Sequence, residues 1–389
     1  MARAESPSRA YLDWNATTPP LEAVLDAMRE AACVAWGNPA SVHAHGRAAR
    51  ARVEEARTAI AELSLSDPRD VVLTSGATEA NNIAIRSAFG ERRAREGAVG
   101  ASLPVLVTSR LEHPSVTQVA EALGREGVAR TRWLAVREDG RVCLDDLARV
   151  LAEEEGVRLV TVQAVNHETG VIQPVSEVAA LCGTHEVRLH VDAVQAWGRV
   201  PFDPRSGETL SLAGHKIRGP KGIGALVARR RVALSPVLVG GAQERGLRPG
   251  TVDPVAASGL AVAARHARDG SVRYASLAPL RDELERALLA LCPAVRVNGT
   301  APRAPHVTNL SWLGFAGPEL VAALDLEGVS VSSGSACSAG TSEPSPVLCA
   351  MLGEERAACA VRVSLGESTT REETAAAVAA FARVVARTI

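Results

Sequence analysis

The sequence predicts an α/β protein with a mostly parallel sheet between layers of helices. Short runs rich in Val and Leu alternate with stretches of helical spacing. The strand-like runs lie at 70–76, 104–109, 157–165 and 187–194, and the helical stretches lie at 77–89, from 115 onward and at 175–185. Nearly continuous apolar strands are typical of a sheet covered on both faces, and their alternation with helices indicates a doubly wound layout.

A smaller α/β unit is expected at the carboxyl end. At roughly 100–200 residues per domain, a chain of 389 residues suggests two domains, and the composition changes near 255–270. After this change the expected elements are a long helix at 271–293, strands at 295–299 and 307–312, and an Ala-rich helix from Thr370. We therefore place a large domain at 16–260 and a small domain at 261–389, with residues 1–15 packing on the small one.

The composition excludes several classes of protein. The chain has 43 basic and 44 acidic residues, so it has no overall field to attract nucleic acid or anionic lipid. It has no run of about 18 apolar residues, and its opening MARAESPSRA lacks the apolar segment of a signal peptide. The seven cysteines include no CxxC pair, which disfavours a zinc ribbon or a disulfide framework. We expect a cytoplasmic protein with reduced thiols.

Lysine is nearly absent from the chain. Of the 43 basic residues only Lys216 and Lys221 are lysines, and both lie in GHKIRGPKGIG. An amine can lose its proton and form an imine with an aldehyde, whereas a guanidinium stays charged. Lys216 is therefore a candidate for covalent chemistry, with chance retention of a surface lysine as the alternative. We interpret Lys221 as a structural or partner-facing residue of the GPKG turn.

Two strand ends supply groups that suit the same chemistry. Asp192 directly follows an apolar run, where ligand sites of open α/β sheets gather, and Gln195 could reach the same ligand. In TSGATEANN a helix is expected to start at Ala77, where free N–H groups and the Thr78 hydroxyl could bind phosphate. An acid on a strand end 24 residues before a lysine is the spacing expected of a pyridoxal phosphate site. Ordinary helix capping is the alternative for Asp192 and Thr78.

Cys337 stands in the segment SSGSACSAGTSEPS, among small and turn-forming residues. Such surroundings favour a mobile, exposed loop over a place in the core. An incidental surface cysteine is the alternative to a functional thiol at this position.

In combination, these segments resemble the cysteine desulfurases of the NifS/IscS type, in the class V aminotransferase branch of fold-type I pyridoxal phosphate enzymes. The resemblance covers almost the whole chain, from YLDWNATTPP to VRVSLGESTT. Between these ends, in the order of the family, lie WGNPASVHAHG, TSGATEANN, EHPSV, VNHETGV, HVDAVQAWG, GHKIRGPKGIGAL, ERGLRPGT and SSGSACSAGTSEPS. The resemblance implies the fold-type I architecture, pyridoxal 5′-phosphate as the cofactor, and a homodimer.

The resemblance also implies how the cofactor is held. Lys216 matches the lysine of the internal aldimine, Asp192 the partner of the pyridinium nitrogen, and Gln195 the donor to the ring hydroxyl. His113 matches the histidine stacked on the ring, and Asn166 the asparagine near the ring hydroxyl and the substrate carboxylate. The residues that match the phosphate site are Ala77, Thr78, His215 and, donated by the neighbouring subunit, Thr251.

Two further matches concern the substrate. Arg362 in VRVSLG matches the arginine that grips the substrate carboxylate, a task that suits a planar fork. Cys337 matches the nucleophile that accepts sulfur as a persulfide, on a loop that resembles the longer, mobile version of the NifS/IscS group. The implied activity converts L-cysteine to L-alanine. The sulfur would then pass to an acceptor protein such as an iron–sulfur scaffold, or into another thiolation.

Two positions depart from the pattern of the family. Ala213 stands three residues before the lysine, where a phosphate-binding serine is common, so one hydrogen bond to phosphate is expected to be missing. Ser211 is not an obvious substitute, because it points elsewhere on its strand. Glu367 stands where relatives of the IscS type have arginine.

Two other functions remain open from the sequence. One is a selenocysteine or C–S lyase, or an aminotransferase, of the same fold, in which Cys337 is incidental. The other is a catalytically idle scaffold or partner-binding relative. The loop around Cys337 argues against the first. The complete set of Lys216, Asp192, His113 and Arg362 argues against the second.

Overall fold

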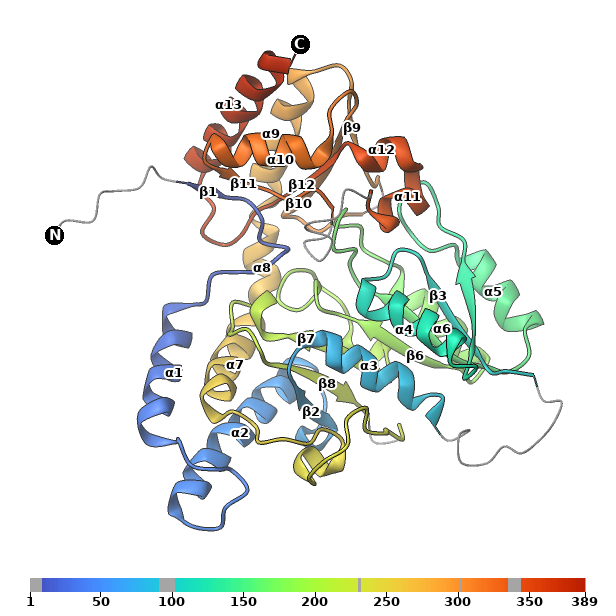
Figure 1. Cartoon of the computed structure of the whole chain (residues 1–389), viewed down its shortest axis with the longest axis vertical. Helices are drawn as coiled ribbons and strands as arrows, with labels where there is room; N and C mark the ends of the chain where they lie inside the picture. Colours follow the sequence, from blue (N-terminus) through green and yellow to red (C-terminus); the bar gives the residue numbers. More distant parts are fainter. Residues whose placement is uncertain (1–8, 91–101, 230–231, 301, 335–343, 389) are drawn as a thin grey trace.

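A seven-stranded mixed sheet forms the centre of the larger part of the molecule (Figure 1). The computed structural model describes residues 9–90, 102–229, 232–300, 302–334 and 344–388. In spatial order the strands are β2 (Val71–Thr74), β8 (Gly224–Ala228), β7 (Thr209–Ala213), β6 (Arg188–Asp192), β5 (Val157–Gln163), β3 (Val105–Ser109) and β4 (Arg130–Leu134). β8 runs antiparallel to both neighbours and the other pairs are parallel, which confirms the predicted mostly parallel sheet.

Helices cover both faces of this sheet. They are α1 (Glu22–Val34), α2 (Ala44–Leu63), α3 (Ala77–Ser87), α4 (Pro114–Arg125), α5 (Leu144–Glu153), α6 (Val175–Thr184) and α7 (Pro254–Ala267). Successive side chains of a strand point to opposite faces. Val71 and Leu73 of β2 therefore pack in the core that includes α2, α5, α6 and α7, whereas Val72 between them packs with α3. In β3 the same alternation directs Leu106 toward α4.

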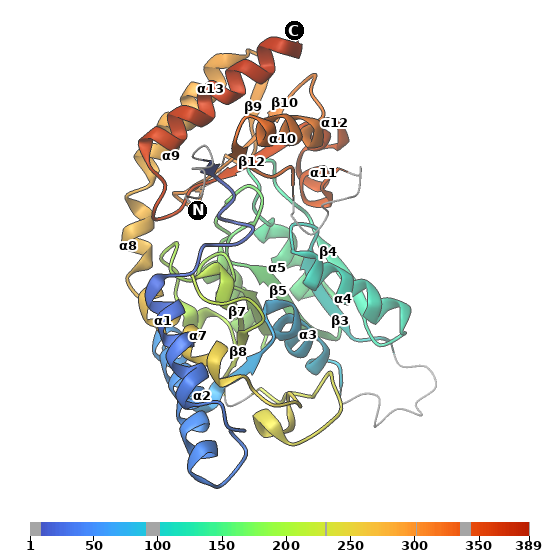
Figure 2. The same cartoon turned by 60° about the vertical axis from the view of Figure 1, so that its left-hand side comes forward.

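The second part of the molecule has its own sheet and its own core. β10 (Val307–Trp312) lies between β12 (Ala360–Ser364) and β9 (Val295–Val297), antiparallel to both, and β1 (Ala10–Tyr11) pairs in parallel with β11 (Val329–Ser330). Its helices are α8 (Gly270–Ala275), α9 (Ala278–Leu291), α10 (Gly317–Leu326), α11 (Pro346–Leu352), α12 (Glu354–Ala358) and α13 (Arg371–Thr388). Figure 2 shows α9 and α13 side by side. Trp312 stacks on Phe381 of α13, with ring centroids 5.0 Å apart.

The region 271–293 forms two helices instead of one. α8 ends at Ala275 and α9 begins at Ala278, with Pro279 in the first turn of α9. Proline has no N–H to bond back to the preceding turn, and its ring crowds that turn. The prediction of one long helix was therefore wrong.

The two parts are joined through α7 and the N-terminal segment. α7, up to Ala267, packs in the large core, whereas Tyr274 of α8 and Leu284 and Leu288 of α9 pack in the small core. The boundary predicted at 260 thus lies inside α7. Leu12 of the N-terminal segment packs in the small core. A few residues later, the N–H of Thr18 donates to the backbone oxygen of His215 in the large part, 3.1 Å away.

Candidate active site

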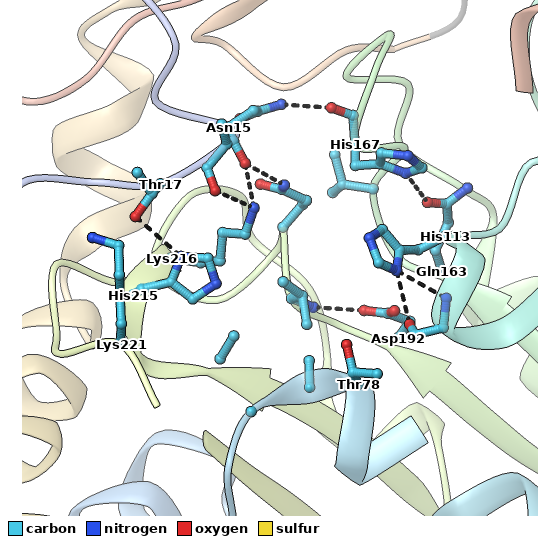
Figure 3. A pocket seen from close by; sticks show the side chains of 18 of the residues that line it. Asn15, Thr17, Thr78, His113, Gln163, His167, Asp192, His215, Lys216 and Lys221 are labelled. Atoms are coloured by element: carbon cyan, nitrogen blue, oxygen red, sulfur yellow. Dashed lines mark hydrogen bonds between the residues drawn. The ribbon is translucent and has the colours of Figure 1, made fainter. Parts of the chain in front are cut away.

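A cavity of about 470 Å³ lies where the carboxyl ends of β5, β6 and β7 meet the N-terminal segment and β12 (Figure 3). The carboxyl ends of parallel strands are where open α/β sheets place their ligands. Most of the predicted site residues line this cavity, namely Ala77, Thr78, His113, Asp192, Gln195, His215, Lys216 and Arg362.

Asp192 is the last residue of β6, and two hydrogen bonds fix its carboxylate. Oδ2 accepts one from the side-chain amide of Asn81 on α3 at 2.8 Å, and Oδ1 accepts one from the N–H of Val194 at 3.1 Å. Asn81 also donates to Oγ of Ser115, and its oxygen lies 3.0 Å from Nε2 of His190. Burial lowers the pKa of His190 to about 4, so this ring is neutral at pH 7. The carboxylate is thus a fixed acceptor, suited to a protonated ring nitrogen.

His113 precedes α4 and lies on the same wall. Its Nδ1 accepts a hydrogen bond from the N–H of Ser115 at 3.1 Å. Burial, aided by the neighbouring His167, lowers the pKa of His113 to about 4. The ring of His167 stands edge-on to it, with centroids 5.3 Å apart. At pH 7 His113 is therefore neutral, and because its Nδ1 is occupied its proton is on Nε2.

Lys216 follows β7 in a single turn of 3₁₀-helix, Gly214–Lys216. Its Nζ donates to the backbone oxygen of Asn15 and to that of Ala16, the latter at 2.8 Å. The N-terminal segment therefore holds the amine against the cavity, as Figure 3 shows for Asn15.

The N-terminus of α3 opens into the cavity. Gly76 precedes the helix, no side chain caps it, and a Cβ at this position would meet nothing within 4 Å. The first N–H groups of α3, at Ala77 and Thr78, are therefore available to an anion at the positive end of the helix dipole. Ala213 lines the cavity without offering a side-chain donor, and Ser211 is fully buried away from the cavity wall. An amine, a fixed carboxylate and an anion cradle in one cavity fit pyridoxal phosphate.

Both lysines of the chain line this one cavity. Figure 3 shows Lys221 beside His215, on the side away from Asp192. Burial and the positive charges of Lys216 and Lys221 lower the pKa of His215 to about 3, so its imidazole is neutral at pH 7. The sequence placed Lys221 in a turn but could not place that turn at the cavity, because the position of GPKG over the cavity depends on the rest of the chain.

Arg362 reaches the cavity from β12. It is 2% exposed, and it donates to Oδ1 of Asp13 at 2.6 Å and to the backbone oxygen of His167 at 2.9 Å. Its Nε has no hydrogen-bond partner within the described chain. A carboxylate that enters the cavity can therefore compete with Asp13 for a guanidinium that still has an unused donor.

Three predicted residues do not line the cavity. Asn166 is fully buried behind the wall, where its side-chain oxygen accepts hydrogen bonds from the N–H groups of Glu168 and Thr169. Thr251 borders a different pocket. Cys337 lies outside the described residues. The roles given to all three stay predictions.

The sequence analysis missed several polar residues that organise the site. Asn15 binds Lys216 through its backbone, and Asn81 holds Asp192. Arg199 binds both Asn15 and the backbone oxygen of Lys216. Asn15 and Asn81 lie in segments that carried the resemblance, but only their contacts distinguish them from ordinary turn and helix residues.

The fold and this set of groups define a pyridoxal phosphate enzyme built on a doubly wound sheet. The profile of the aminotransferase class-V family matches residues 10–376. The chain belongs to this family and, within it, to the cysteine desulfurases of the NifS/IscS type.

Two curated relatives support that placement. An IscS-like cysteine desulfurase of Mycobacterium tuberculosis is 38% identical over 385 residues, covering 97% of this chain and 96% of the relative. A protein of Bacillus subtilis described as a putative cysteine desulfurase IscS 1 is 39% identical over 389 residues, covering 97% and 99%.

Solved structures agree with the sequence comparison. A NifS-like protein superimposes with a TM-score of 0.87 at 29% identity, covering 97% of this chain and all of that one (100%). The structure of DndA from Streptomyces lividans has a TM-score of 0.74 at 36% identity, covering 90% and 97%.

Proposed function

We propose that this chain is a pyridoxal phosphate-dependent cysteine desulfurase that converts L-cysteine to L-alanine and takes the sulfur onto Cys337 as a persulfide. The observation that carries the proposal is the shared cavity of Lys216, Asp192, His113 and Arg362. An amine, an acid, a neutral imidazole and a carboxylate-binding guanidinium are the groups this reaction needs.

The residues that would hold the cofactor follow from the geometry. Asp192 suits the protonated ring nitrogen, Gln195 the ring hydroxyl, and the N-terminus of α3 with Thr78 and His215 the phosphate. Lys216 supplies the amine for the aldehyde. When bound, pyridoxal phosphate supplies a carbonyl for the substrate amine and a ring that withdraws electrons from the α-carbon.

The chain's own groups then act on the substrate. Arg362 exchanges Asp13 for the substrate carboxylate and so fixes the orientation of L-cysteine. The neutral amine of Lys216 removes the proton from the α-carbon and later returns a proton to the product. His113, neutral at pH 7, holds a proton on Nε2 that can pass to or from the substrate.

The sulfur step is a displacement at sulfur. The thiolate of Cys337 attacks the substrate sulfur, an S–S bond forms, and the C–S bond breaks with its electron pair left on carbon, which takes up a proton to give alanine. No external oxidant is required. The described residues next to the segment of Cys337 support the proposal that this segment lies close to the cavity. There, Oγ of Ser345 donates a hydrogen bond to Glu168 at 2.7 Å. Glu168 is the neighbour of His167 on the cavity wall.

We further propose a homodimer in which Thr251 completes the phosphate site of the neighbouring subunit. Its support is that Thr251 is exposed and borders a pocket other than the cavity of its own chain. Most soluble oligomers are two-fold symmetric, so two equivalent composite sites are expected. Analytical ultracentrifugation of the cofactor-loaded protein tests this: a monomer with full occupancy would exclude it.

We also propose an acceptor protein for the persulfide, such as an iron–sulfur scaffold, and a cytoplasmic location. The described cysteines form no disulfide with one another, as is usual in a reducing compartment. In the described part of the chain, no helix is long and apolar enough to cross a membrane.

The deciding experiment compares Cys337→Ser with Cys33→Ser, a change at an exposed cysteine on α1. Purified protein with bound cofactor is incubated with L-cysteine, and alanine and sulfide are measured. We expect Cys33→Ser to match the unmodified protein and Cys337→Ser to bind cofactor and cysteine without releasing alanine. Undiminished alanine from Cys337→Ser would make Cys337 a bystander and establish the lyase alternative instead.

A further inference from the structure

A buried arginine lies directly behind the active-site lysine. Arg199, in the turn after β6, is 1% exposed, and no carboxylate of the described residues pairs with it. Its hydrogen bonds go to neutral oxygens of Asn15, Gln195, Trp14 and Lys216. Burying a charge without a counter-charge costs free energy of folding. We therefore looked for an effect of this buried charge on its neighbours in the active site.

The contacts of Arg199 fix two residues of the cavity. One nitrogen, Nη1, donates to Oε1 of Gln195, and the amide nitrogen of Gln195 then donates to the backbone oxygen of Asn15 at 3.0 Å. The other nitrogen, Nη2, donates to the backbone oxygen of Lys216 at 2.8 Å. Asn15 joins these groups, because its side-chain oxygen accepts from Arg199 at 2.9 Å and its backbone oxygen accepts from Nζ of Lys216. The guanidinium and the lysine amine therefore share one partner residue.

We propose that Arg199 is a positioning residue of this site that orients the amide of Gln195 and places a permanent positive charge behind Lys216, so that the lysine amine is neutral when it reacts. A like charge disfavours the charged form of an amine, and a guanidinium does not itself give up its proton. Burial, the charges of Lys216 and Lys221 and, to a smaller extent, the charge of Arg199 lower the pKa of the neighbouring His215 to about 3, so the charge of Arg199 reaches this side of the cavity. The inference rests on the proposed function, in which Lys216 binds the cofactor.

Other charged groups near Lys216 have hydrogen-bond partners of their own. Arg362 is bound to Asp13. The negative charge of Glu367 reaches Arg199, but its oxygens accept hydrogen bonds from Arg218, His266 and Arg273. Asp192 is engaged with Asn81 and Val194.

Three buried titratable groups near Lys216 are neutral at pH 7. Burial lowers the pKa of His113 to about 4, lowers that of His306 well below its usual range, and raises that of Tyr274, so all three are neutral. His167 lies 3.5 Å from Glu168, a buried carboxylate that accepts a hydrogen bond from Ser345. Lys221 is exposed, where solvent screens its charge. Arg199 is therefore the buried charge whose removal should be felt most at Lys216.

The test follows the capture of pyridoxal by cofactor-free protein as a function of pH. Pyridoxal lacks the phosphate, so its binding isolates the amine from the anion cradle. Only the neutral amine reacts with the aldehyde, and the rate of the absorbance change therefore rises with pH to a midpoint. Arg199→Gln removes the charge while keeping a side chain that can form hydrogen bonds. Arg356→Gln is the matched control, since Arg356 also donates to neutral oxygens, but in the small part.

We expect Arg199→Gln to raise the midpoint by about one pH unit, and thus to slow capture at neutral pH about tenfold. Arg356→Gln should keep the midpoint of the unmodified protein. An unchanged midpoint in folded Arg199→Gln overturns the proposal. If that variant does not fold, Gln195→Glu places a carboxylate on Nη1 of Arg199, and the midpoint must again rise; no rise overturns the proposal equally.

A second control separates this inference from the proposed function. Lys216→Ala should abolish the capture altogether. Capture that persists without Lys216 would refute the proposed role of the lysine. Capture that depends on Lys216 but ignores Arg199 would refute only the role of Arg199.

Discussion

The two walls of the cavity are built in different ways. On the large-part wall Asp192 is held by Asn81, which also contacts Ser115 and His190, and all four residues belong to strands or helices around one sheet. On the opposite wall Arg362 is held by Asp13, 349 residues away in the sequence, and by the backbone of His167, 195 residues away.

The difference suits two kinds of ligand. The Asp192 wall is a connected network of short hydrogen bonds, as needed for a group that stays bound. The Arg362 wall contains a pair that an incoming carboxylate can exchange, and its guanidinium has a donor, Nε, without a partner in the described chain. We infer that the first wall serves the permanent cofactor and the second serves the substrate that enters and leaves.

The largest effect is expected where the walls meet, at Lys216. Lys216→Arg should abolish both the visible absorbance of the bound cofactor and all measurable turnover, because a guanidinium cannot form the imine. Absorbance spectra and an alanine assay measure both. Arg149→Lys, on the exposed surface of α5, is the control and should change neither. Retained covalent absorbance in Lys216→Arg would contradict the assignment.

The second-largest effect is expected from Arg362→Lys, which should weaken substrate binding without affecting cofactor binding. The fork that can bind both carboxylate oxygens is lost, and a hydrogen bond to a charged group contributes about 1.5–3 kcal/mol. We expect the KM for L-cysteine to rise roughly 10- to 100-fold, as these energies imply, with cofactor affinity unchanged. Steady-state kinetics and cofactor titration measure the two quantities. An equal loss of cofactor affinity would show that the walls are not independent.

Asn81→Ala tests the network behind Asp192. Loss of a hydrogen bond to a charged group should weaken cofactor binding and lower kcat, each about tenfold, while the KM for L-cysteine changes little. The adjacent Asn82→Ala is the matched control, because among the described residues the side chain of Asn82 bonds only to the backbone oxygen of Thr78 in its own helix. Cofactor titration measures the affinity of both variants. An equal loss of affinity in Asn81→Ala and Asn82→Ala would contradict the role assigned to Asn81.

The smallest expected effect is on stability against acid. The folded pKa of His190 is about 4, below the ordinary value near 6.5, so the unfolded chain binds the proton more readily between these values. The contribution is present above about pH 6.5 and is lost as the pH falls toward 4, at about 1 kcal/mol per pH unit. Urea unfolding of the cofactor-free protein between pH 6.5 and 5 should show this slope.

The slope should be smaller in His190→Gln and unchanged in His185→Gln, where the histidine is exposed. An equal slope in all three proteins would contradict the contribution assigned to His190.

Much of the fold could be predicted because its signals are local. The strand predicted at 307–312 was confirmed at its observed bounds, and the runs at 104–109 and 187–194 hold β3 and β6. The helix expected from Thr370 begins with reciprocal hydrogen bonds. The N–H of Glu373 donates to Oγ1 of Thr370 at 3.2 Å, and the N–H of Thr370 donates to Oε2 of Glu373 at 2.8 Å. Such a capping box can be recognised from four consecutive residues of the sequence.

In the candidate site, too, the features that are local in sequence could be predicted and the long-range contacts could not. Asp192, Thr78 and Lys216 could be found from the sequence, because strand ends, helix starts and a rare residue type are features of the chain itself. The partners of these groups could not. The pairing of Arg362 with Asp13, the placement of Lys221 on the cavity wall, and the contact of Arg199 with Asn15 each join segments far apart in sequence. A hydrogen bond depends on distance and direction in space, and only the folded chain sets these for distant residues.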